Sequence, residues 1–248
     1  MNNHFTIAID ACNQEKWIER CVNTCLLQKY DNFEVILVDA LSDDKTYEIC
    51  KDIESKSDKF KVYQNEVRIP QIANMVFLTK MSKENTIVVS VDGDDWLPDV
   101  NVLSRLNDVY NSREILVTYG SYVCFPSGQR SDWAHKYPDH VISHNMFRDY
   151  PWVATHLRTY KRELFLKINE IDFKREDGEW LDTTGDMAFM IPMLEMAGSR
   201  SEFIKDTMYV YNMANDSADS YLNRERQLEL EKYIRSKPKY KYLDNVSR

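Results

Sequence analysis

Strand-like and helix-like segments alternate through the first 92 residues, and this order constrains the fold more than any other feature of the chain. Apolar residues in Glu15–Gln28 recur at helical spacing, whereas Thr86–Val91 (TIVVSV) is the continuous apolar run of a strand covered on both faces. Such alternation predicts an α/β fold with a mostly parallel sheet and right-handed crossovers. The strands are expected at Phe5–Ile9, Phe33–Val38, Lys61–Gln64 and Thr86–Val91, and the helices at Glu15–Gln28, from Asp43 or Asp44 to Ser57, and at Pro70–Lys83.

The second half of the chain has fewer regular elements and longer polar segments. Pro126–Asp149 is polar and aromatic with little periodicity, which is typical of a long functional loop or a lid. Pro192 lies within the expected helix Asp186–Ala197 and should kink it. Further elements are expected as helices at Pro98–Asn111 and Arg224–Lys237 and as a strand at Ile115–Tyr119.

The charge of the chain narrows the classes of function. Lys and Arg number 32 against 40 Asp and Glu, which gives a formal net charge of −8. Nucleic-acid binding needs clustered basic residues at the phosphates, so no nucleic-acid partner is expected. A diphosphate bound through a metal ion is compatible with this charge.

The sequence also bears on the compartment. No stretch approaches the roughly 18 apolar residues of a membrane span, and the amino terminus lacks the features of a signal peptide. The five cysteines are an odd number without a disulfide framework, and Cys21 and Cys25 are expected to be small buried residues. A reducing, cytoplasmic location is therefore expected.

Three carboxylates stand together in the run Asp92–Asp95 (DGDD), directly after the apolar strand. Ligands of open α/β sheets bind at the carboxyl ends of the strands. Crowded carboxylates repel one another and favour a divalent cation, and oxygen ligands suit Mg²⁺ or Mn²⁺. A plain turn before a helix at Pro98 is the alternative. An EF-hand loop is a poor fit, because its twelfth position is Leu103 instead of Glu.

Three histidines, His135, His140 and His144, form a second group with potential metal ligands. A zinc site needs tighter geometry and a fourth ligand. A polar loop is therefore the better explanation of these histidines.

The chain resembles the family 2 glycosyltransferases, which share the nucleotide-diphospho-sugar (GT-A) fold. The segment FTIAIDACNQEKWIERCVNTCLLQKYDNFEVILVDALSDDKT resembles the opening of that family almost throughout. The family's Pro-Thr-Tyr-Asn-Glu string corresponds to Asp10–Gln14 (DACNQ), its Val-Asp-Asp-Gly-Ser string to Val38–Ser42 (VDALS), and its Asp-x-Asp motif to Asp92–Asp94. The resemblance implies one GT-A domain over residues 1–248, with a nucleotide-sugar half at 1–120, an acceptor-side half at 121–215 and a helical tail at 216–248.

The resemblance also implies which residues bind the donor. Ala11 and Asn13 stand in the string after the first strand. Asp39 is what remains of the family's acidic pair at the uracil and ribose, because Ala40 takes the second place. Arg68 falls where related enzymes place an arginine against the nucleotide, although an exposed arginine before a helix is the alternative.

The acidic run would bind both ribose and metal. By the resemblance, Asp92, Gly93 and Asp94 contact the nucleotide, and Asp92 and Asp94 hold the metal with help from Asp95. Asn212 and Asn215, near the family's late aromatic strand Tyr209–Asn212, are weaker candidates for contacts with phosphate or metal.

Asp186 is the candidate catalytic residue. Family members carry an acidic residue at the start of a helix in this half, and a positioned carboxylate can take the proton of an attacking hydroxyl. An aspartate that opens a helix is also a common cap. Asp182 and Glu179 are rival candidates for the base.

The acceptor side is expected to involve a strand with basic residues and two large aromatics. His156 or Arg158 would touch the diphosphate or the acceptor, with solvated basic residues as the alternative. Trp152 and Trp180 are candidate sugar platforms, although such residues more often only pack. The acceptor-side candidates are thus Trp152, His156, Arg158, Trp180 and Asp182.

The implied activity is metal-dependent transfer of a hexose from UDP-glucose or UDP-galactose to a hydroxyl, with inversion as in most of the family. The segments TYGSYVCFPSG, HLRTYKRELF and GDMAFMIPMLEMAGSR resemble a branch found in giant viruses and some bacteria, which glycosylates hydroxylysine of collagen-like proteins. That branch implies a collagen-like acceptor, or a sugar already attached to it, and the host cytoplasm if the chain is viral. An acidic surface would suit such a Lys-rich acceptor.

Other functions are also consistent with parts of the sequence. A catalytically inactive nucleotide-sugar or glycan-binding module is the main alternative, because Asp10, Ala40 and Leu41 depart from the family's strings. A nucleotidyltransferase would need a Gly-rich phosphate loop, and the chain has only six glycines. The tail helix Arg224–Lys237 is expected to pack on the domain or to pair two copies in a homodimer.

Overall fold

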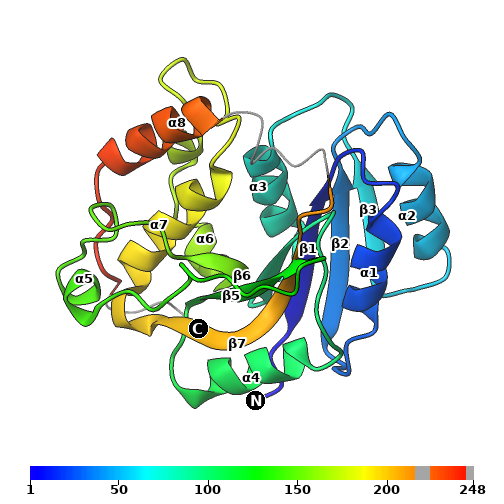
Figure 1. The fold of residues 1–248 in the computed structure, drawn as a ribbon, viewed down its shortest axis with the longest axis horizontal. Helices are drawn as coiled ribbons and strands as arrows, with labels where there is room; N and C mark the ends of the chain where they lie inside the picture. The colour runs from blue at the N-terminus through cyan, green and yellow to red at the C-terminus, as the bar shows by residue number, and fades with distance from the viewer. Residues whose placement is uncertain (216–223, 244–248) are drawn as a thin grey trace.

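The computed structural model describes residues 1–215 and 224–243, and its centre is a seven-stranded sheet (Figure 1). Along the sheet the strand order is 3-2-1-4-6-5-7. The sixth strand runs antiparallel to both of its neighbours, and all other neighbouring strands are parallel. The strands are β1 (Phe5–Ala11), β2 (Phe33–Asp39), β3 (Phe60–Gln64), β4 (Ile87–Asp92), β5 (Val117–Phe125), β6 (Thr155–Lys161) and β7 (Ser201–Asn212).

Helices cover both faces of this sheet, as the continuous apolar runs of its central strands predict. α1, α2 and α4 bury their apolar sides on one face, and α3, α6 and α7 bury theirs on the other. The helices are α1 (Ile18–Leu26), α2 (Thr46–Glu54), α3 (Gln71–Met81), α4 (Val102–Ser112), α5 (Asp139–Ser143), α6 (Arg162–Phe165), α7 (Gly185–Ala197) and α8 (Arg224–Ser236).

The predicted α/β fold with a mostly parallel sheet is confirmed, and two strands extend beyond their predicted limits. β5 runs to Phe125, whereas the sequence predicted its end at Tyr119. β7 is a twelve-residue strand, of which the sequence indicated only the end. It pairs along β5 at the edge of the sheet, and several of its polar side chains remain exposed, which weakens the apolar signal.

The segment 126–149 is anchored more firmly than the expected lid. It contains α5, and Tyr137, Val141 and Phe147 are buried in the core below α7. Tyr137 also donates its backbone N–H to the Tyr119 hydroxyl, at 3.0 Å. The sequence did not indicate these buried residues, because the polar residues between them are mostly exposed and break any periodic apolar pattern.

The tail helix α8 lies beside α7 on the side of the molecule away from α1 and α2 (Figure 1). Leu230 and Ile234 of α8 are buried in the same core cluster as α7. The packed alternative for this helix is therefore the one seen in this chain. Residues 216–223 and 244–248 of the expected tail lie outside the described residues.

Two further expectations have structural outcomes. Cys21 and Cys25 are fully buried on α1, as expected. None of the helices described, up to residue 215 and over 224–243, is long and apolar enough to cross a membrane.

Candidate active site

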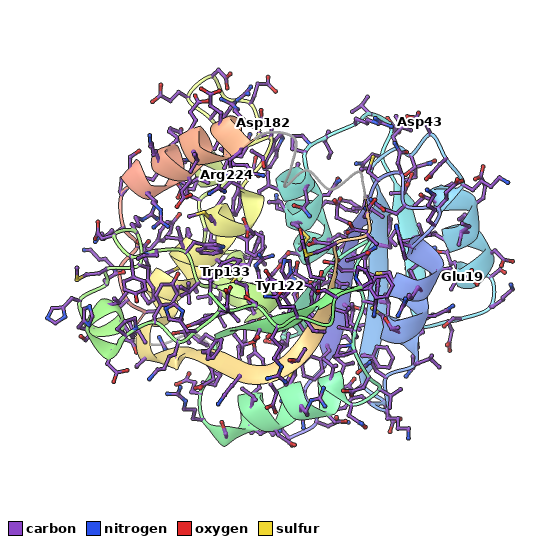
Figure 2. The ribbon with its side chains drawn as sticks, viewed as in Figure 1. Glu19, Asp43, Tyr122, Trp133, Asp182 and Arg224 are labelled. Carbon is purple, nitrogen blue, oxygen red and sulfur yellow. The ribbon has the colours of Figure 1, made fainter. Side chains whose placement is uncertain are left out.

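A cavity of about 710 Å³ opens where β1, β4 and β6 meet α3 and α7. The carboxyl ends of the parallel strands β1 and β4 form its floor, and α8 contributes to its wall. Figure 2 shows Tyr122 and Trp133 close to one another near the centre of the view, with Asp182 and Arg224 together at the start of α8. All four of these residues line the cavity.

Asp92 and His156 line the cavity, and the buried Asp95 beside them completes a group of three possible metal ligands. One ligand atom of each lies within 4.8 Å of the others, and His156 Nε2 is 3.9 Å from Asp92 Oδ2. Asp95 is 1% exposed, and its Oδ2 has no hydrogen-bond partner among the described residues. An unpaired buried carboxylate oxygen is costly, so this donor set fits a divalent cation.

The electrostatics of these three side chains support the same conclusion. Burial raises the pKa of Asp92 to about 6, and the negative charges of Asp94 and Asp186 add to the effect against Arg158. Burial also raises the pKa of Asp95 well above its usual range. Burial next to Arg158 holds the pKa of His156 well below its ordinary value, so its ring is neutral. A neutral imidazole is the form that binds metals.

Asp94 is placed differently from the metal ligand that the sequence suggested. Its Oδ2 accepts a hydrogen bond from Asn215 Nδ2 at 2.7 Å, and its backbone oxygen accepts one from Asn212 Nδ2 at 3.1 Å. The backbone N–H of Asn212 also donates to Asp95 Oδ1 at 2.7 Å. Asn212 at the end of β7 and Asn215 just after it therefore fix the acidic turn, and Asn215 binds one carboxylate oxygen of Asp94.

Gly93 allows this turn to lie directly on β1. Its N–H donates to the carbonyl of Asp10 at 2.9 Å. A Cβ at this position would be 2.6 Å from the Ala11 Cβ and 2.9 Å from the Asp10 carbonyl oxygen. Ala11 is 2% exposed, so it supports the turn from below and has little surface for a direct nucleotide contact.

Replacing Gly93 with alanine is expected to displace the acidic turn from β1. The added methyl group would overpack the site, which costs about 1–3 kcal/mol of unfolding free energy. Chemical denaturation of Gly93→Ala and of the wild type checks this value. Equal stability of Gly93→Ala and the wild type would contradict the close approach.

Asp186 lies at the start of α7 and faces the cavity beside Arg158. Arg158 Nη2 donates to Asp186 Oδ2 at 2.7 Å, and the Met187 backbone N–H donates to Oδ1 at 2.8 Å. Arg158 is buried and also donates from Nε to the carbonyl of Ala154 at 3.2 Å. The arginine therefore holds the carboxylate in a fixed orientation at the edge of the cavity.

Three donor-side predictions, Asn13, Asp39 and Arg68, lie at or just after the ends of β1, β2 and β3. Asp39 is completely buried; it accepts hydrogen bonds from Ser42 and from Gln64 Nε2, the latter at 3.0 Å. The exposed Asn13 accepts a hydrogen bond on its Oδ1 from the backbone N–H of Asp43, at 2.8 Å. Arg68 pairs with Asp43 and lines the cavity. These residues thus hold the ends of β1, β2 and β3 together beside the cavity, and of the three only Arg68 lines it.

The acceptor-side predictions divide into residues at the cavity and residues away from it. Trp152 and Asp182 line the cavity, and Asp182 pairs with Arg226 at 3.3 Å and Arg175 at 3.6 Å. Trp180 does not line the cavity; it packs on the core under Lys174, whose Nζ is 4.9 Å from the ring centroid. The rival base Glu179 is exposed in the turn just before Trp180.

Sequence reasoning missed several residues that line the cavity. Gln71 Nε2 donates to Asp92 Oδ1 at 2.9 Å. Tyr122 forms aromatic contacts with Trp133, His156 and Tyr211, at centroid distances of 6.4, 6.0 and 5.3 Å. These aromatics could not be predicted, because they come together only through the pairing of β5 with β7 and the fold of the following loop.

Asp10 is a further missed residue. It lines the cavity floor next to Asp92, and Asn74 Nδ2 donates to its Oδ1 at 2.6 Å. Burial raises its pKa to about 7, with smaller contributions from Asp92 and Asp39 and against the hydrogen bond from Asn74. The departure of Asp10 from the family's proline was the available signal.

Residues 6–170 match the family described as Glycosyl transferase family 2. Glycosyltransferase GlyA of Streptococcus pneumoniae serotype 4 is 23% identical over 193 residues, which are 72% of this chain and 27% of GlyA. This chain therefore spans about a quarter of that relative.

Two solved structures share the fold of the chain. S. aureus TarS 1–349 in complex with UDP-GlcNAc has a TM-score of 0.70 at 20% identity, over 93% of this chain and 65% of TarS 1–349. The mannosyltransferase PcManGT from Pyrobaculum calidifontis, in complex with GDP-Man and Mn²⁺, has a TM-score of 0.64 at 17% identity, over 97% of this chain and 66% of PcManGT.

Proposed function

Because the chain belongs to glycosyl transferase family 2 and is a glycosyltransferase with the GT-A fold, we propose that it transfers a hexose from a UDP-sugar to a hydroxyl acceptor, with inversion and with a divalent metal. The observation that carries the proposal is that Asp92 and His156, which form a possible metal-binding group with the buried Asp95, line the same cavity as Asp186. Metal ligands and a candidate base are the two elements that such a transfer needs.

The proposed metal ligands are Asp92, Asp95 and His156, and the ion is Mn²⁺ or Mg²⁺. When bound, the cation would stabilise the charge that develops on the diphosphate leaving group. Gln71 orients Asp92 through its 2.9 Å hydrogen bond. Asn212 orients Asp95 by donating its backbone N–H. Asp94 accepts a hydrogen bond from Asn215 through Oδ2 and is not part of this proposed set.

Asp186 is the proposed general base. Its carboxylate would take the proton of the acceptor hydroxyl while the hydroxyl oxygen attacks the anomeric carbon of the donor. Arg158 is a positioning residue, because its hydrogen bond keeps the carboxylate directed at the cavity. Attack from the face opposite to the diphosphate would invert the configuration of the anomeric carbon.

Loss of a residue that only orients a metal ligand usually weakens metal binding by roughly 10- to 100-fold. Replacing His156 with alanine is expected to weaken Mn²⁺ binding by more than that. The reason is that the substitution removes a ligand itself. Calorimetric titration with Mn²⁺ alone measures the effect. His140→Ala, an exposed histidine of α5, is the matched control. Unchanged Mn²⁺ affinity of His156→Ala would exclude this ring from the metal site.

UDP-glucose or UDP-galactose is the proposed donor. The complex of TarS with UDP-GlcNAc supports a uridine nucleotide, whereas that of PcManGT with GDP-Man makes guanosine the alternative. The experiment is nucleotide release from a panel of UDP- and GDP-sugars in the presence of Mn²⁺. Release from one UDP-hexose supports the proposal, and release from GDP-mannose only would replace its donor.

The proposed acceptor is hydroxylysine of a collagen-like protein, or a sugar attached to it, as in the giant-virus branch that the sequence resembles. Attraction of a Lys-rich acceptor would come from the overall charge of −8. Two acidic residues of the cavity wall, Asp182 and Glu231, are paired with Arg226 and Arg235 and so add little to this attraction. Modification of simple glycosides but not of hydroxylysine peptides, with or without an attached sugar, would remove this acceptor.

A catalytically inactive nucleotide-sugar or glycan-binding module is the second candidate function, favoured by the burial of Asp39 and the substitution of Ala40 in the donor-side string. Such a module would bind UDP without consuming a donor.

The five free cysteines agree with the proposed reducing, cytoplasmic compartment. A homodimer through α8 would use its exposed Leu228, and the mass of the protein in solution tests it.

A further inference from the structure

Asp10 is a carboxylate at the cavity floor that the proposed mechanism does not use. It lies near the end of β1, and two amides from elsewhere in the chain hold it in place. Asn74 Nδ2 of α3 donates to Asp10 Oδ1 at 2.6 Å, and Asn65 Nδ2 donates to Asn74 Oδ1 at 2.8 Å. Asn74 is completely buried, so this arrangement is fixed by the core.

The second oxygen of this carboxylate is left for the cavity. Within residues 1–215 and 224–243, the hydrogen bond from Asn74 is the one that the Asp10 side chain makes, and it uses Oδ1. Asp10 lines the cavity, so Oδ2 is available to a bound molecule. A buried carboxylate without full hydrogen bonding is costly, and the raised pKa of Asp10 reflects that cost.

Asp92 lies beside Asp10 in an equivalent arrangement. The two residues are register partners on the neighbouring parallel strands β1 and β4, so their side chains project from the same face of the sheet. Gln71 of α3 holds one oxygen of Asp92, as Asn74 holds one oxygen of Asp10. Two carboxylates are thus presented side by side, each oriented by an amide of the same helix.

The chemistry of this pair selects its ligand. A carboxylate oxygen that makes no other hydrogen bond accepts one from an O–H group, and two adjacent carboxylates repel the anionic oxygens of a diphosphate. The neighbouring hydroxyls of a pentose or hexose offer O–H donors at a spacing that two adjacent carboxylates can match. We infer that Asp10, with Asp92, forms a hydroxyl-binding subsite for the donor. This inference rests on the proposed function, because it takes the donor to be a nucleotide-sugar.

The test is the affinity of Asp10→Asn for UDP, UDP-glucose and UDP-galactose in the presence of Mn²⁺, measured by calorimetry. Loss of a hydrogen bond to a charged group predicts a decrease in affinity of roughly 10- to 100-fold. An equal decrease for UDP and the UDP-sugars assigns the subsite to the ribose. A decrease for a UDP-sugar alone assigns it to a hydroxyl of the transferred sugar.

Two controls separate a binding role from a structural one. Asp58→Asn makes the same change at an exposed position before β3 and should leave all affinities unchanged. The melting temperature of Asp10→Asn should not fall, because asparagine can still accept from Asn74 and removes a buried charge. Unchanged affinities for every nucleotide in Asp10→Asn would overturn the inference while the proposed function stands. Failure of the wild type to bind any UDP- or GDP-compound would instead overturn the proposed function.

Discussion

Asp186→Asn is expected to lower the rate of sugar transfer by roughly 100- to 10,000-fold, the usual contribution of a general base. The substitution keeps the shape of the side chain, and its oxygen can still accept the hydrogen bond from Arg158 Nη2. It removes the site that takes the acceptor proton. Donor binding should remain close to that of the wild type, because the proposed metal ligands are not altered.

Acceptor-dependent UDP release at saturating donor measures this effect, and calorimetry measures donor binding separately. Asp182→Asn is the matched comparison, because Asp182 lines the same cavity and was the rival candidate. Its partners Arg226 and Arg175 make it part of a half-exposed ion-pair network, so a small change in rate is expected. A large loss in Asp182→Asn together with a small one in Asp186→Asn would reverse the assignment of the base.

Glu195→Gln is expected to have the largest effect on stability, a loss of about 3–5 kcal/mol in the free energy of unfolding. Glu195 of α7 is 1% exposed and binds Arg148 through two hydrogen bonds, of 2.7 and 2.9 Å. Arg148 also donates to the Ile234 carbonyl of α8, and Glu195 accepts the backbone N–H of Tyr240. The substitution would leave a buried guanidinium without its counter-charge and loosen the attachment of the tail.

Chemical denaturation measures this loss, and an exposed ion pair gives the control. Asp52 on α2 and Lys56 just after the helix are paired at 2.5 Å, but their side chains are 64% and 68% exposed. Lys56→Met should therefore change stability by at most about 1 kcal/mol. If Glu195→Gln were no more destabilising than Lys56→Met, the buried pair would not anchor α8, which forms part of the cavity wall.

The sheet could be predicted from the sequence because its signal is local. The alternation of apolar strands and amphipathic helices in residues 5–92 fixed four parallel strands and three helices, with errors of a few residues at their ends. Element ends depend on capping and tertiary contacts, which a periodic pattern does not contain. The second half was predicted less completely, since β6 and β7 complete a sheet begun by distant residues.

The composition of the site could be predicted only where its residues are adjacent in the chain. Asp92, Asp94 and Asp95 are neighbours in sequence, so a cluster of carboxylates was evident. His156 joins Asp92 only because β6 pairs with β4 in an antiparallel register, and no local pattern indicates that pairing. The turn geometry that directs Asp94 towards Asn215 is likewise set by contact with β7.

Metal-dependent sugar transfer at the Asp92–Asp95–His156 group is tested most directly by nucleotide release with added Mn²⁺ and with EDTA. The wild type and Asp95→Asn would be compared, with the donor that the panel identifies and with glycosides and hydroxylysine peptides as acceptors. The account predicts release by the wild type that EDTA abolishes and Mn²⁺ restores, and little release by Asp95→Asn at any Mn²⁺ concentration that saturates the wild type. Equal release by both proteins, or release by the wild type that EDTA does not change, would contradict it.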